Sequence, residues 1–155
     1  MLSRILPKQF DNDYRGLWLG AVIFVAAMSV KALQGAMSMI NTRNTAINAD
    51  GIPLDSFSPA AQREVLIMFA LLGMWLLVLP LISAVALVRY RSMIPFLFLA
   101  LLVQQLAARI VVYLHTPTSA PAGQPIGFYV NMGILAVTAI GFVLSLVERR
   151  RPNSG

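Results

Sequence analysis

Four long apolar runs determine most of what this chain can fold into. They extend over residues 16–40, 65–88, 93–115 and 126–147. Each is longer than the roughly 20 residues that a helix needs to cross about 30 Å of hydrocarbon. Because lipid offers no hydrogen-bond partner to a backbone amide or carbonyl, such segments must be helical. The sequence therefore predicts an all-α integral membrane protein, an antiparallel four-helix transmembrane bundle.

The composition agrees with lipid as the solvent. Only 12% of the 155 residues are charged, whereas an average soluble domain has about 25%. One membrane domain, residues 1–155, accounts for the whole length, with an outer loop at 41–62 and terminal segments at 1–15 and 148–155. There is no cysteine, which excludes disulfides, thiol catalysis and thiolate metal sites.

Two connections carry signals of their own. Ser58 followed by Pro59 is typical of a helix N-cap with proline at the first helical position. The second helix is therefore expected to begin near Pro59, ahead of its apolar run. Residues 116–125 contain three prolines and are expected to form an extended, stiff connector.

Basic residues outside the apolar runs indicate how the helices are oriented. Eight would lie on the side of the termini, and two on the side of the long loop. The eight are Arg4, Lys8, Arg15, Arg89, Arg91, Arg149, Arg150 and Arg151, and the two are Arg43 and Arg63. By the positive-inside rule both termini are expected in the cytoplasm. Ten arginines to two lysines favours a bacterial chain, and therefore the inner (plasma) membrane.

A cleaved signal peptide is the alternative for the first run. The basic residues before it and the small residues of Ala36-Met37-Ser38 would suit one. The acidic residues Asp11 and Asp13, and the apolar residues that continue after Lys31, favour an uncleaved span.

The net charge of +6 would suggest nucleic acid as a partner of a soluble protein. Here most basic residues flank the apolar runs, where they meet anionic headgroups. Membrane lipids are the expected partners, and nucleic acid is not.

Two cations interrupt the apolar runs: Lys31 in the first and Arg109 in the third. In the predicted topology both lie in the outer half of the bundle. A charged residue at the centre of a membrane helix costs roughly 2.5–3.5 kcal/mol on insertion scales. Such residues almost always face the bundle interior or a water-filled cavity.

Other polar residues accompany these two cations. Gln34 follows Lys31 by three positions and Gln105 precedes Arg109 by four, so each pair shares a helix face. Asn131 and Glu64 lie near the outer ends of the fourth and second helices. We therefore predict a net-cationic pocket that could clamp a carboxylate, a phosphate or a lipid headgroup. Its predicted ligand-binding residues are Lys31, Gln34, Glu64, Gln105, Arg109 and Asn131.

A purely structural interpretation competes with the pocket. Arg109 lies about 9 Å along the helix axis from His115, a distance that an arginine side chain can largely cover toward the interface. Lys31 could extend in the same way, and Glu64 could pair with either cation to stabilise helix packing. Both interpretations remain open from the sequence.

The residue patterns favour binding over catalysis. The sequence contains no nucleophile–base pair, phosphate-binding glycine loop or metal cluster, so no catalytic residue, metal or cofactor is predicted. We expect a non-enzymatic accessory or binding protein. The alternatives are an oligomeric transporter or channel component and a lipid-modifying membrane enzyme. Gly16 and Gly20 form a GxxxG pattern, for which packing within the molecule is favoured over a homo-oligomer or another membrane-protein partner.

Overall fold

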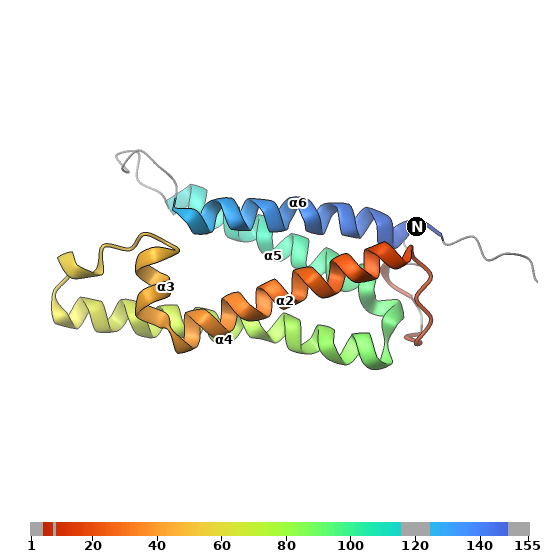
Figure 1. Ribbon diagram of the computed structural model, residues 1–155, viewed down its shortest axis with the longest axis horizontal. Coiled ribbons are helices and arrows are strands. Elements are labelled where there is room, and N and C mark those ends of the chain that lie inside the picture. Colours follow the sequence, from red (N-terminus) through yellow and green to blue (C-terminus); the bar gives the residue numbers. More distant parts are fainter. Residues whose placement is uncertain (1–4, 8, 116–124, 149–155) are drawn as a thin grey trace, which may run out of the picture.

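Four long helices make up the computed structural model, which describes residues 5–7, 9–115 and 125–148. They are α2 (Trp18–Ile40), α4 (Pro59–Arg89), α5 (Ile94–His115) and α6 (Ile126–Leu146), shown in Figure 1. All four are long and apolar enough to cross a membrane. Over the described ranges there is no strand. The all-α fold with four candidate membrane spans is therefore confirmed.

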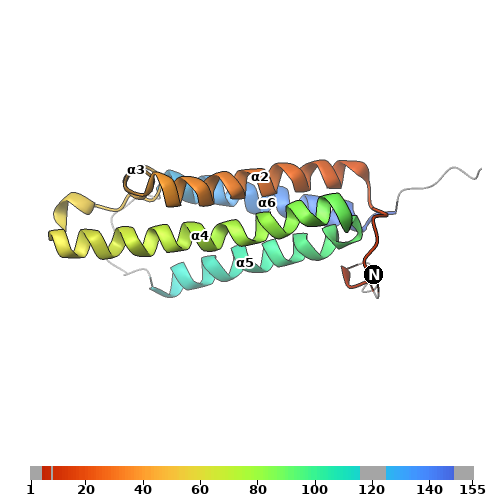
Figure 2. The same ribbon diagram turned by 90° about the horizontal axis from the view of Figure 1, so that it is seen from below.

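Successive long helices run in opposite directions (Figure 2). The Leu17 amide, before α2, donates to the Leu144 carbonyl near the end of α6 (3.3 Å). The Gly127 amide, at the start of α6, donates to the Ala49 carbonyl in the segment after α2 (2.8 Å). We call the end of the bundle with the Leu17–Leu144 bond the hairpin end, because it also carries the α4–α5 turn. The other, which carries residues 41–58, is the loop end.

The segment at the loop end is more regular than expected. It contains a short helix, α3 (Thr42–Asn48), and a 3-10 turn, η1 (Leu54–Ser56). Thr42 and Thr45 donate hydrogen bonds from their hydroxyls to the Met39 and Met37 carbonyls of the last turn of α2 (3.0 and 3.1 Å). These side-chain bonds to the last turn of α2 hold α3 against α2.

The predicted start of the second long helix is confirmed. The Ser58 hydroxyl accepts a hydrogen bond from the Ala61 amide (3.4 Å), and Pro59 occupies the first turn. With 31 residues, α4 is about 46 Å long, whereas hydrocarbon is about 30 Å thick. The helix continues through Pro80 to Arg89. The predicted connector lies outside the described residues except for Pro125, as do Arg4, Lys8 and the arginines after Glu148.

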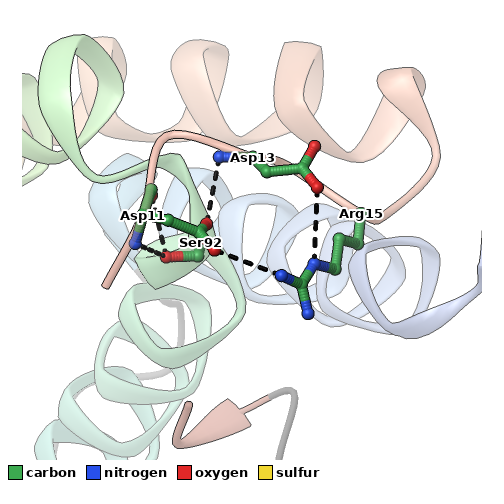
Figure 3. Close-up of polar contacts among 4 residues, drawn as sticks. All are labelled: Asp11, Asp13, Arg15 and Ser92. Atoms are coloured by element: carbon green, nitrogen blue, oxygen red, sulfur yellow. Dashed lines mark hydrogen bonds and ion pairs between the residues drawn. The ribbon is translucent and has the colours of Figure 1, made fainter. Parts of the chain in front are cut away.

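The segment before α2 is fastened to the α4–α5 turn, η2 (Arg91–Met93), as Figure 3 shows. The Ser92 hydroxyl donates to the Asp11 carbonyl and accepts from the Asp11 amide, both at 2.9 Å. Arg15 then bridges the Asp11 carboxylate (3.1 Å) and the Asp13 carboxylate (3.5 Å). These contacts hold the hairpin end together across 81 residues of sequence.

The apolar core lies toward the hairpin end, where α2 and α5 meet. Phe24 and Phe98 are fully buried and pack edge to face, with ring centroids 5.0 Å apart. Met28, Leu97 and Leu101 extend the same cluster. Aromatic pairs of this geometry contribute about 0.5–1.5 kcal/mol beyond their buried area.

Glycines allow the closest approaches between helix backbones. A Cβ atom on Gly73 of α4 would lie 2.7 Å from the Gly35 carbonyl oxygen of α2 and 2.8 Å from the Met39 amide nitrogen. At the hairpin end, a Cβ atom on Gly16 would lie 2.5 Å from the Ser145 carbonyl oxygen. The GxxxG pattern that begins at Gly16 therefore packs within the molecule, as the sequence favours.

We expect Gly73→Ala to destabilise the bundle by about 1–3 kcal/mol, because the added methyl meets backbone atoms that cannot move aside. The matched control is Gly133→Ala on α6, where a Cβ atom would meet nothing within 4 Å. That change should be neutral or stabilising by up to about 1 kcal/mol through helix propensity. Unfolding in mixed detergent–denaturant micelles measures both. Equal effects of the two substitutions would contradict the close α2–α4 contact.

Candidate functional site

A cavity of about 50 Å³ lies among the four long helices. Its lining combines two cations, three side-chain amides and four apolar residues. They are Lys31 of α2, Leu76 of α4, Gln104, Gln105, Ala108 and Arg109 of α5, and Asn131, Met132 and Leu135 of α6. Within the described ranges no carboxylate lines this cavity.

Lys31 is held inside the bundle. Lys31 is only 6% exposed, and its Nζ atom donates to Oδ1 of Asn131 on α6 (3.0 Å). The Asn131 amide group donates in turn to the Gly127 carbonyl one turn earlier (2.9 Å), which orients Oδ1 toward the lysine. Lys31 therefore takes a partner on α6. The structural interpretation instead had its side chain extending to the interface.

Arg109 lies on the side of the cavity that faces the loop end. Its guanidinium carbon is 5.4 Å from the ring centroid of Phe128, a cation–π contact with the first turn of α6. The residue is half-buried. The guanidinium thus rests on an aromatic face, and this contact uses none of its five N–H donors.

Asp50 is the acid that interacts electrostatically with Arg109. It follows α3, next to the Ala49 carbonyl that binds the Gly127 amide. Partial burial of the carboxyl raises the pKa of Asp50 above its ordinary value of 3.8, while the positive charge of Arg109 acts in the opposite direction. A Cβ atom on Gly127 would lie 2.8 Å from Oδ1 of Asp50 and 2.9 Å from the Ala49 carbonyl oxygen, so glycine at this position allows the close approach of the turn to α6.

Gln105 supplies a neutral polar group at the base of the cavity. Its Nε2 atom donates to the Thr138 hydroxyl (3.3 Å), which itself donates to the Ile134 carbonyl (2.6 Å). The residue is 7% exposed, and its Oε1 atom is buried without a hydrogen-bond partner among the described residues. A buried acceptor in that state costs about 1–3 kcal/mol.

Four of the six predicted ligand-binding residues surround this one cavity: Lys31, Gln105, Arg109 and Asn131. The other two do not line it. Gln34 is half-buried elsewhere on α2, and Glu64 is exposed on α4. The acid that interacts electrostatically with Arg109 in the structure is Asp50, which the sequence did not indicate.

Phe128 and Thr138 were missed in the sequence, although a signal for them exists. They lie three residues before and seven after Asn131, which places all three on one helix face. The face is recognisable once Asn131 is known to point inward. No comparable signal leads to Asp50, because its position depends on how residues 49–51 fold over α6.

We expect Asn131→Leu to destabilise the protein by about 1.5–3 kcal/mol, because it leaves the buried Lys31 ammonium without its acceptor. Lys31→Met in the same chain should recover most of that loss. A double-mutant cycle of unfolding free energies in mixed micelles measures the coupling. Strictly additive effects of the two substitutions would show that the Lys31–Asn131 bond is not formed.

Asp50→Asn should raise the melting temperature at pH 7. Because the folded-state pKa of Asp50 is raised, the folded protein binds the carboxyl proton of Asp50 more tightly than the unfolded chain does. Its destabilising effect is absent below pH 3.8 and develops as pH rises through the folded-state value. The difference between variant and parent should therefore disappear in acid. Asp55→Asn is the control, because it removes the 2.6 Å ion pair with Arg43 and should give no such gain.

A scan against protein-family models and searches of curated proteins and of solved structures found no match to this chain. What the protein binds is therefore inferred from its own residues.

Proposed function

We propose that this multi-pass membrane protein is a binding protein for a small anionic group, which it holds in the cavity between Lys31 and Arg109. One observation carries the proposal. Two cations line a single cavity together with three neutral amides, and no described carboxylate shares it. A site whose charged groups are all cations is suited to an anion.

The energetics support an occupant of opposite charge. Lys31 is 6% exposed and Arg109 is half-buried, so both have lost much of their hydration. Their mutual repulsion is stronger in this environment than in water. An anion between them offsets both the lost hydration and the mutual repulsion. Arg109 could bind it with two parallel hydrogen bonds, and Lys31 has two N–H groups beyond the one that Asn131 takes.

The geometry supports binding more than chemistry. The cavity residues provide donors and amides, whereas Glu64, Tyr113 and His115, which an enzyme would need nearby, are exposed and do not line it. We therefore keep the accessory or binding role as the proposal.

The location in the cell is part of the same proposal. The distribution of basic residues, eight against two, supports a hairpin end in the cytoplasm. The cavity would then lie in the outer half of the membrane. The excess of arginine over lysine supports the bacterial inner membrane.

The test is an anion-dependent shift in stability. We expect inorganic phosphate to stabilise the parent protein in mild detergent, by about 1.4 kcal/mol at ten times its dissociation constant. Lys31→Met and Arg109→Met should each abolish the shift, whatever they do to stability without phosphate. Arg63→Met removes an exposed cation outside the cavity and should leave the shift intact. Loss of the shift in Arg63→Met alone, or no shift in the parent protein, would overturn the proposal.

A further inference from the structure

The positions of the lining residues indicate that the cavity opens sideways, between α4 and α5. α4 packs mainly against α2, and Figure 1 shows that α4 and α5 join at the hairpin end and separate toward the loop end. The cavity lies where they have separated, with Leu76 on one side and Gln104 and Ala108 on the other. Gln104 and Ala108 line the cavity and are nevertheless exposed.

The route from the loop end is more restricted. The turn at residues 49–51 folds over the first turn of α6, where the Gly127 amide bonds to the Ala49 carbonyl (2.8 Å). Arg109 lies beneath this region, with its guanidinium on the Phe128 ring. In a membrane, the opening between α4 and α5 faces lipid chains. An occupant can therefore reach the cavity from within the bilayer.

The polar groups of the cavity specify more than a negative charge. Lys31 and Arg109 are donors only, whereas the unpartnered Oε1 atom of Gln105 is an acceptor. An ionised carboxylate has acceptors only and leaves Oε1 unsatisfied. A singly protonated phosphate monoester offers anionic oxygens to the cations and a P–OH donor to Gln105.

The size of the cavity agrees with this group. A volume of about 50 Å³ holds roughly three to five water-sized groups. That is enough for a phosphoryl group and too little for an acyl chain, which must remain outside. The outer surface next to the opening is apolar: Leu72 and Trp75 of α4 are 52% and 66% exposed.

We propose that the cavity binds the phosphoryl group of a lipid phosphomonoester, which enters between α4 and α5 and leaves its chains against the surface around Trp75. This inference rests on the proposed anion binding and names its ligand class. The cavity residues bind the headgroup, and the bilayer supplies the route.

The chain contains two tryptophans, which provide a matched pair of reporters. Trp75 is the neighbour in sequence of Leu76, which lines the cavity, and Trp18 lies at the hairpin end with nearly the same exposure, 65% against 66%. Trp18→Phe leaves only the first reporter and Trp75→Phe leaves only the second. Each variant is placed in phosphatidylcholine vesicles that contain an equal mole fraction of one brominated lipid: phosphatidic acid, phosphatidylcholine or oleic acid.

Brominated phosphatidic acid should quench Trp75 with an apparent association about tenfold above brominated phosphatidylcholine, which corresponds to about 1.4 kcal/mol. That is the size of one hydrogen bond to a charged group. No such excess is expected at Trp18. Lys31→Met and Arg109→Met should remove the excess at Trp75, and Arg63→Met should keep it.

Each other outcome has a distinct meaning. Equal quenching by phosphatidic acid and phosphatidylcholine, with the phosphate-dependent stability shift retained, would overturn the lipid assignment and leave a site for free phosphate. Loss of both signals would overturn the anion-binding proposal itself. Equal enrichment of brominated oleic acid would overturn the phosphomonoester class, and equal enrichment at Trp18 would overturn the position of the site.

Discussion

Hydrocarbon contains no water to satisfy a polar group, and this constraint shapes every level of the molecule. It requires the backbone to bond within helices, which produces the four long helices. It also acts on the few polar side chains within them. Lys31 bonds to Asn131 across two helices, and Gln105 bonds to Thr138 across another pair. Both bonds join α6 to a neighbour, so the polar groups that are most costly in lipid also help to position the fourth helix.

The same constraint explains why small residues lie where the helices cross. Between membrane helices, lipid chains are as apolar as leucine, so burial of apolar area contributes little to association. Close van der Waals packing replaces it. Gly35 and Gly73 let α2 and α4 approach backbone to backbone, and Gly16, just before α2, lets the chain approach the backbone of α6 at Ser145. α4 has no comparable contact with α5 near the cavity, and the two helices separate there (Figure 1). The helix pairs whose backbones approach closely thus carry glycine at their contact.

Prediction from sequence was accurate where a single segment contains the information. The apolar runs located the four helices, and Ser58 with Pro59 located the start of α4. Prediction was partial where contacts between segments determine which residues lie together. Lys31, Gln105, Arg109 and Asn131 were chosen because polar residues avoid lipid, and they do line one cavity. Glu64 was chosen because it lies near the right depth, but depth does not say toward which neighbour a helix face points. Glu64 is exposed and does not line the cavity, whereas Asp50 interacts electrostatically with Arg109.

By itself, the sequence determined the solvent of this protein, its secondary structure and the unusual presence of two cations within apolar helices. These follow from local chemistry, because the length and polarity of a segment decide whether it can lie in lipid. Only the tertiary structure decided that both cations share a cavity and that Lys31 bonds to α6. These depend on the rotation of each helix about its axis and on the separation of helix pairs. Both are set by glycine contacts and hydrogen bonds between residues up to 100 positions apart, which no local pattern records.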